Sequence, residues 1–363
     1  MYAWLDRLNH DQRRAATHDG GPLCVLAGAG TGKTTTLTSR VAWLVAEGVP
    51  AERILLLTFT RRAAREMVSR TERLLAGTVA GRTRVVGGTF HSVAHRMLRR
   101  NAAALGLPEG FSVLDTSDAA DLVDLVRHEA GLSATGRRFP RKATLLDLYS
   151  RAVNTGRPLS DVVADTAPWC ADQLEGIAEV CKGYVALKRA RGLLDFDDLL
   201  LYWRAAATHP QLGPQLGGEF DHVLVDEYQD VNSLQVDIVA ALRAEDRRVT
   251  VVGDDAQAVY GFRGASPRHL LDIADRFPDV TTVTLGRNYR STQLILDVAN
   301  GISADAPEGF EVRLRGDDPG TVPPRRVSCG DEDAEVHTVC DAVLAHREEG
   351  MSLQSQAVLV RAA

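Results

Sequence analysis

Residues Leu23–Thr34, with the sequence LCVLAGAGTGKT, decide which fold this chain is expected to adopt. The stretch begins with the apolar run Leu23–Leu26, which is typical of a buried strand, and continues through a glycine-rich turn. It ends at Lys33 and Thr34, where a helix is expected to begin. In such a loop, backbone N–H groups surround nucleotide phosphates, the lysine adds a positive charge and the threonine hydroxyl binds Mg²⁺. The helix N-terminus adds its positive dipole end, so the stretch predicts a nucleoside-triphosphate site.

One position departs from the pattern G-x-x-x-x-G-K-[S/T], because Ala27 stands where the first glycine is expected. The strand, the later glycines and the helix start are all present. We therefore favour phosphate binding over a glycine-rich turn that contains Gly-Lys-Thr by coincidence. The residues expected to surround the phosphates are Ala29, Gly30, Thr31, Gly32, Lys33 and Thr34.

Length and composition indicate a globular protein of more than one domain. The 363 residues suggest two or three domains, and the hydrophobic content of 45% and charged content of 25% are ordinary for a soluble protein. No apolar run approaches the ~20 residues of a membrane span, and the N-terminal residues lack a signal-peptide core. The five cysteines form no C-x-x-C pair. Neither a metal cluster nor a disulfide framework is therefore indicated, and a cytoplasmic location is expected.

The net charge of −6 argues against a protein that coats nucleic acid through overall basicity. Arginines are nevertheless clustered, and a basic groove needs only a few of them. Each cluster taken alone is more typical of a solvated helix face than of a DNA contact. The clusters are Arg61, Arg62 and Arg65; Arg82 and Arg84; Arg96, Arg99 and Arg100; and Arg137, Arg138, Arg141 and Lys142.

Apolar segments alternate with segments of helical periodicity, which predicts an α/β fold with a parallel sheet and crossover helices. Strands are predicted over 23–26, 53–60, 83–89, 219–225, 248–252 and 280–285. Helices are predicted over 33–47, 61–75 and 91–100. In such sheets ligands gather at the C-terminal ends of the strands. The segment from about Asn101 to Arg191 has helical periodicity without a convincing strand and is expected to form a helical insertion. Residues 194–200 then read as an acidic helix start.

Two adjacent carboxylates, Asp226 and Glu227, follow the predicted strand that ends at Val225. Downstream of a phosphate loop, such a pair has a specific use. The first carboxylate holds Mg²⁺, usually through water, and the second activates or orients the attacking water. An acidic pair on a surface loop would be unremarkable, but at the end of a buried strand we favour catalysis.

The stretch GDDAQAVYGFRGA at 253–265 follows the next predicted strand. Gln257 is placed to sense a γ-phosphate. Tyr260 and Phe262 alternate with small residues and are interpreted as stacking platforms for bases; the alternative is that both belong to the core. Ahead of the phosphate loop, Gln12 in LNHDQ can hydrogen-bond an adenine edge, although these residues also suit an ordinary helix start.

Eight stretches in this order resemble those of the superfamily 1 DNA helicases of the UvrD/Rep/PcrA type. They are LNHDQ, AGAGTGKT, TFTRRAAREM, GTFHS, LDFDDLL, VDEYQD, VVGDDAQAVYGFRGA and NYRS. The resemblance covers nearly the whole chain, and the ordered set is far more specific than any single member. It implies a RecA-like P-loop fold and an ATP-dependent motor that moves 3′→5′ along single-stranded DNA.

The resemblance also implies roles for residues of the ATP site. It implies that Gln12 reads the adenine and that Tyr289 stacks on it. Asp226 is implied to bind Mg²⁺ together with Thr34, and Glu227 to act as the general base for the attacking water. Arg290 is implied to act as an arginine finger within the same chain.

For DNA, the resemblance implies a single-strand track whose residues are Phe59, Arg61, His91, Tyr260 and Phe262. Gln257 is implied to link the γ-phosphate to this track, and Arg263 to help couple the two sites. Phe262 stands where the family usually has tryptophan, so stacking survives with less area. The implied partners are single strands, junctions of single- and double-stranded DNA, and DNA-repair proteins.

The domain organisation implied is a first RecA-like domain at 1–92 and 191–284, a helical subdomain at 93–190, and the beginning of a second RecA-like domain at 285–363. In the last segment a strand near Val327, a helix from about Asp331 to His346 and a strand over 356–360 are predicted. Later family motifs find no match. We therefore expect a fragment of a longer helicase rather than a naturally short protein, with weak DNA-stimulated hydrolysis and little unwinding of its own.

Two other functions stay open at this point. One is a module whose hold on single-stranded DNA or on a repair partner is switched by ATP without productive hydrolysis. The other is a P-loop kinase or GTPase. The latter is disfavoured because the sequence has no Asn-Lys-x-Asp motif for guanine and the aromatic stretch at 257–263 would have no purpose.

Overall fold

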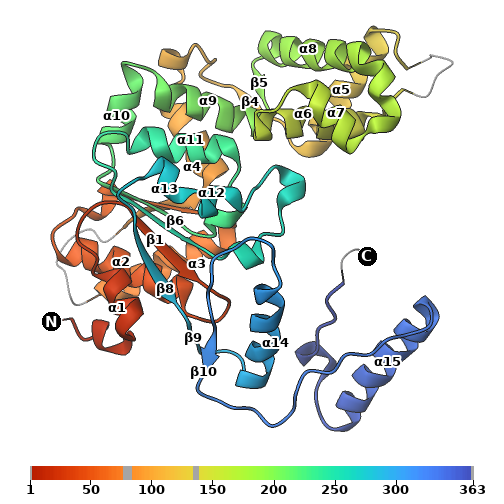
Figure 1. The fold of residues 1–363 in the computed structure, drawn as a ribbon. Helices are drawn as coiled ribbons and strands as arrows, with labels where there is room; N and C mark the ends of the chain where they lie inside the picture. Colours follow the sequence, from red (N-terminus) through yellow and green to blue (C-terminus); the bar gives the residue numbers. More distant parts are fainter. Residues whose placement is uncertain (1, 77–83, 134–138, 361–363) are drawn as a thin grey trace. The chain divides into compact units, whose positions relative to one another are not determined.

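The computed structural model describes residues 2–76, 84–133 and 139–360 (Figure 1). The chain divides into two compact units, Met1–Asp318 and Pro319–Ala363. The first unit contains the sheet and every residue for which the sequence predicts a role at the ATP or DNA site. Arg82, Arg137 and Arg138 of the predicted arginine clusters lie outside the described residues.

A six-stranded sheet forms the centre of the first unit (Figure 1). Its strands lie in the order β3-β2-β6-β7-β1-β8, and all neighbouring pairs are parallel. The four inner strands are buried along their whole length, as expected when helices cover both faces. The strands are β1 (Leu23–Ala27), β2 (Ile54–Thr58), β3 (Val86–Thr89), β6 (His222–Val225), β7 (Val249–Gly253) and β8 (Thr281–Leu285).

The predicted α/β fold and six strands are thus confirmed, each strand within a few residues of its expected range. Two apolar cores lie on the two faces of the sheet, because successive side chains of a strand point in opposite directions. Leu55 and Leu57 of β2 belong to the core that contains Trp203, whereas Ile54 and Leu56 belong to the other. The helices associated with the sheet are α1 (His10–Ala16), α2 (Lys33–Ala46), α3 (Arg61–Leu75), α4 (Phe90–Arg100), α9 (Phe196–Thr208), α10 (Leu212–Gly218), α11 (Ser233–Leu242), α12 (Arg268–Leu271) and α13 (Ile273–Arg276).

Residues 116–191 are mainly helical, as their periodicity predicts, and their four α-helices, called the helical subdomain from here on, have an apolar core of their own. Its helices are α5 (Thr116–Glu129), α6 (Lys142–Thr155), α7 (Leu159–Thr166) and α8 (Leu174–Arg191). The expectation that the insertion contains no strand is wrong in one detail, because β4 (Ser112–Val113) pairs in parallel with β5 (Leu193–Leu194). Two-residue strands carry too little periodicity to be recognised in a sequence.

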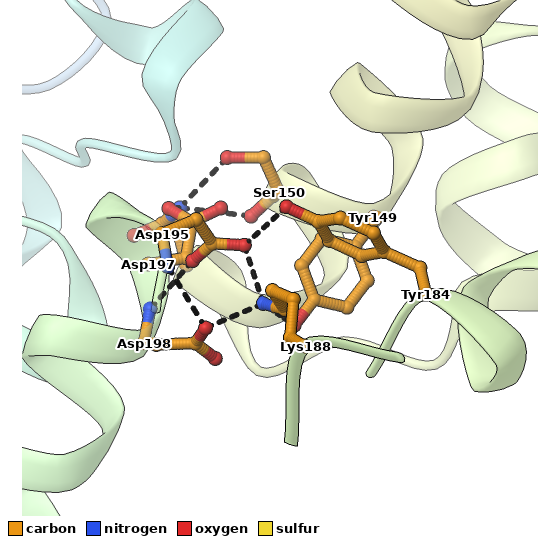
Figure 2. Close-up of polar contacts among 8 residues, drawn as sticks. Tyr149, Ser150, Tyr184, Lys188, Asp195, Asp197 and Asp198 are labelled. Carbon is orange, nitrogen blue, oxygen red and sulfur yellow. Dashed lines mark hydrogen bonds and ion pairs between the residues drawn. The ribbon is translucent and has the colours of Figure 1, made fainter. Parts of the chain in front are cut away.

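A buried lysine ties this helical subdomain to the start of α9 (Figure 2). Lys188, at the end of α8, is 2% exposed, and its Nζ lies 2.5 Å from a carboxylate oxygen of Asp195 and of Asp198. Asp195 is the N-cap of α9, and its other oxygen accepts a hydrogen bond from the Asp198 N–H. The Tyr184 hydroxyl donates to Asp195 at 2.7 Å. Since a buried charge is tolerated only when paired, the acidic helix start expected at 194–200 serves here to pair this ammonium.

Replacing Lys188 with methionine should therefore lower the free energy of unfolding by about 3–5 kcal/mol, because two buried carboxylates lose their counter-charge. Lys182→Met is the matched control, since Lys182 lies on the same helix with an exposed side chain and its loss should cost less than about 0.5 kcal/mol. Urea unfolding of both variants measures the difference. Equal destabilisation would contradict this account of the cluster.

After β8, the chain adds β9 (Arg287–Asn288), α14 (Gln293–Ala304) and β10 (Arg315–Gly316), and β9 and β10 pair in parallel. The second unit contains α15 (Glu332–Glu348), which confirms the predicted helix. The strands predicted near Val327 and over 356–360 are wrong, because the described residues of this unit form no strand. Val327 and Leu359 are 57% and 96% exposed, and an apolar run without a neighbouring strand has no ladder to join. None of the described helices is long and apolar enough to cross a bilayer.

Candidate nucleotide and DNA site

The loop between β1 and α2 has a backbone that only glycine fits at two positions. Gly30 and Gly32 have φ values of +74° and +90°. A Cβ on Gly32 would lie 2.5 Å from Nε2 of Gln12, and a Cβ on Gly30 would lie 2.6 Å from Nδ2 of Asn288. The loop is therefore packed closely by side chains from two other segments, and it leads directly into the N-terminus of α2, which favours an anion.

The segment before the sheet holds one side of this loop. The Gln12 side chain is buried and donates from Nε2 to the Thr31 carbonyl oxygen at 2.9 Å. The same side chain completes a capping box with Asn9 at the start of α1. The predicted adenine reader therefore lies against the loop and also begins a helix, so the two readings of LNHDQ are compatible.

The NYRS stretch, 288–291, holds the other side. Asn288 donates from Nδ2 to the Ala29 carbonyl oxygen at 2.6 Å, and the Tyr289 N–H donates to the Gly30 carbonyl oxygen at 2.9 Å. The Tyr289 side chain is half-exposed, and its hydroxyl accepts from Nδ2 of Asn9 at 2.8 Å. No role was predicted for Asn288 from the sequence, although its position as the first residue of NYRS was a signal that could have pointed to one.

Lys33 faces the acidic pair across the sheet edge. Its Nζ lies 3.3 Å from Oε2 of Glu227, and Glu227 has a left-handed backbone with φ of +50°. Asp226 is buried, and burial raises its pKa to about 7, helped by the neighbouring Glu227 and opposed by Lys33. Burial and the Glu227 charge also raise the pKa of Asp230 to about 6. Three carboxylates therefore share one ammonium.

A polar chain continues from Glu227 to the next strand end. Gln229 donates from Nε2 to Glu227 at 2.9 Å, and its Oε1 accepts from the Asp254 N–H at 3.0 Å. Gln257 donates in turn to the Asp254 carboxylate at 2.5 Å. Gln229 is a residue that sequence reasoning did not single out, and its only signal was its place inside VDEYQD. Gln229 therefore contacts both Glu227, the proposed base, and the backbone of the loop that carries Gln257.

The residues present fit a nucleoside triphosphate with a divalent cation. Lys33 Nζ and Asp226 Oδ1 are buried, and neither makes a hydrogen bond to another described residue. A cation beside Asp226 would offset the surplus of carboxylates, and oxygen ligands suit Mg²⁺. Thr34, the second residue of α2, is placed beside Lys33 at the same helix end.

Aromatic side chains gather beside this edge. The Phe59 and Tyr260 rings lie 4.4 Å apart between centroids, and Tyr260 and Phe262 lie 5.9 Å apart. Phe262 is 56% exposed, and none of the three belongs to the buried cores, which argues against the core alternative. His91 contacts Phe196 edge-on at 5.9 Å, and Arg61 is exposed at the start of α3. The Arg263 side chain lies outside what the structure describes.

Residues 8–278 match the family model of the UvrD/REP helicase N-terminal domain. The chain belongs to this family.

Curated relatives of the UvrD family support the assignment. The ATP-dependent DNA helicase UvrD2 of Mycobacterium tuberculosis is 40% identical to this chain in an alignment that covers 98% of this chain and 52% of that protein. UvrD1 of the same organism is 38% identical over 85% of this chain and 41% of its own length. PcrA of Leuconostoc citreum is 40% identical over 81% of this chain and 39% of its own length. The chain thus spans about half the length, or less, of these relatives.

The UvrD-type loop predicts a specific effect of a methyl group at Gly32. Gly32→Ala should weaken ATP binding by at least about tenfold, because the new Cβ meets the Gln12 amide and the backbone is strained. Gly48→Ala is the matched control. Gly48 also has a positive φ, +102°, but a Cβ there meets nothing within 4 Å. Titration with a fluorescent ATP analogue should show near wild-type affinity for the control and weak binding for Gly32→Ala; equal affinities would contradict the proposed loop.

Proposed function

We propose that this chain is the ATP-hydrolysing, single-strand-binding part of a UvrD-type helicase that translocates 3′→5′ on DNA. The observation that carries the proposal is the contact of Lys33 with Glu227, which Gln229 and Asp254 connect to the loop that bears Gln257 and the aromatic side chains. A phosphate loop alone would suit many enzymes. A polar chain from its lysine to an aromatic track suits a nucleotide-driven motor on single strands.

In the ATP site, each group has a task that its position supports. The loop backbone with Lys33 would bind the phosphates, and Thr34 and Asp226 would hold Mg²⁺. ATP, when bound, supplies the phosphoanhydride bond whose cleavage releases free energy. Glu227 would accept a proton from the attacking water, and its carboxylate is oriented by Gln229. Arg290 would approach the phosphates from the NYRS segment, whose backbone already contacts the loop.

In the DNA site, stacking on Phe59, Tyr260 and Phe262 would bind bases without regard to sequence. Arg61 would contact a phosphate, and His91, Arg263 and Gln257 are proposed to extend the track and to connect it to the ATP site. Single strands, single/double-strand junctions and DNA-repair proteins are the proposed partners. The segment 285–363 is proposed to begin the second RecA-like domain of such a motor, with 1–92 and 191–284 as the first.

ATP hydrolysis by this chain, with and without oligodeoxythymidine, tests the proposal. Turnover should rise with the oligonucleotide, and Lys33→Ala should abolish it. Glu227→Gln should lower turnover by about 10²–10⁴-fold while ATP still binds, since only proton transfer is lost.

The alternative function makes a different forecast for the same experiment. A module that ATP merely switches would bind the oligonucleotide in a nucleotide-dependent way without turnover at any oligonucleotide concentration. That result would overturn the motor proposal.

A further inference from the structure

The side-chain amide of Asn154, near the end of α6, is buried. It connects the helical subdomain to the loops that follow β6 and β7. Asn154 is 7% exposed and belongs to none of the eight sequence stretches that carry the family resemblance. Its Nδ2 donates to Oδ1 of Asp197 at 2.7 Å, and its Oδ1 accepts from Nδ2 of Asn232 at 2.7 Å. Both neighbours belong to other elements, so one amide connects three parts of the chain.

Each of those partners borders a functional segment. Asn232 caps α11 and lies two residues after Asp230, the last residue of the acidic loop 226–230. It also forms an antiparallel bridge with Ala265, just after the loop that carries Phe262. The end of α6 packs tightly there, since a Cβ on Gly264 would lie 3.2 Å from Asn154 Cβ and 3.2 Å from the Thr155 methyl carbon.

On its other side, the amide reaches the acidic helix start of α9. Asp197 lies beside the buried Lys188 cluster (Figure 2). Burial raises the pKa of Asp197 to about 6, with a further contribution from Asp195, and its bond from Asn154 opposes that rise. The amide therefore satisfies a carboxylate that has no ammonium of its own in contact among the described residues, while Lys188 serves Asp195 and Asp198.

We propose that Asn154 is a positioning residue that couples the helical subdomain to two loops during the ATP cycle. One is the acidic loop 226–230, and the other is the loop that carries Tyr260 and Phe262. The proposal rests on the proposed function, because it assigns a route between the two sites of that motor. The Asn232–Asn154–Asp197 chain has a fixed hydrogen-bond direction, in which Asn232 donates to Asn154 and Asn154 donates to Asp197. Movement of α6 would thus be transmitted to the residue that follows the acidic loop and to the bridge with Ala265.

The direction of the chain provides a sharp test. Asn232→Asp removes the donor to Asn154 but keeps an excellent N-cap for α11, so the fold is retained. Asp197→Asn keeps an acceptor for Asn154 and is the matched control.

Turnover of the intact chain is measured without DNA and with saturating oligodeoxythymidine, together with KM for ATP and the unfolding temperature. Asn232→Asp should lose about five- to tenfold of the DNA-stimulated turnover and keep DNA-free turnover, KM for ATP and stability. Asp197→Asn should resemble wild type, because an amide oxygen at that position still accepts from Asn154.

The outcomes separate the role of Asn154 from the proposed function. Wild-type stimulation that persists in Asn232→Asp, or a loss that is equal with and without DNA, would overturn the role of Asn154 alone. Absence of any stimulation in the wild type would overturn the proposed function and this inference with it.

Discussion

The parallel order of the sheet is the constraint on which the rest of the structure depends. Because every strand runs in the same direction, all strand ends with their following loops meet at one edge. β1 lies between β7 and β8, with Leu26 in register with Gly253 on one side and with Thr284 on the other. The phosphate loop is thereby flanked by the loop that carries Gln257 and by the NYRS segment. The buried apolar character of the inner strands fixes this register, since a shift by one residue would turn core side chains outward.

Two lysines of the chain show how the ion pairs of an ammonium distinguish a structural lysine from a ligand-binding one. Lys188 is enclosed, contacts two carboxylates at 2.5 Å and has no capacity left for a ligand. Lys33 lies 3.3 Å from Glu227, whose side chain is 34% exposed, and makes no hydrogen bond to a described residue. The Lys188 ammonium pairs with the two carboxylates of the α9 capping box, Asp195 and Asp198, and so stabilises the fold. The Lys33 ammonium stands where phosphate oxygens can complete its hydrogen bonds, which is the arrangement expected of a binding group.

Much of the fold could be predicted from local patterns, because the inner strands are uniformly apolar and the helices between them begin at recognisable residues. Lys33 and the acidic pair were recognisable for a related reason. Lys33 follows such a strand through a short glycine-rich loop, and the acidic pair comes directly after another. Gln229 and Asn154 could not be found in this way. Their roles depend on contacts across 25 and 78 residues, with Asp254 and Asn232, and such pairings leave no periodic signal. The strand predicted near Val327 was wrong because apolar character leads to a strand only where a neighbouring strand is present.

We propose above all that nucleotide binding at the phosphate loop and single-strand binding at Phe59, Tyr260 and Phe262 are coupled. This coupling is tested most directly by binding of a fluorescein-labelled oligodeoxythymidine to this chain, followed by anisotropy at increasing concentrations of Mg²⁺ and a non-hydrolysable ATP analogue. The account predicts that the analogue changes oligonucleotide affinity by about fivefold or more, and that the oligonucleotide changes analogue affinity by the same factor. Oligonucleotide affinity that is identical at every analogue concentration would contradict it.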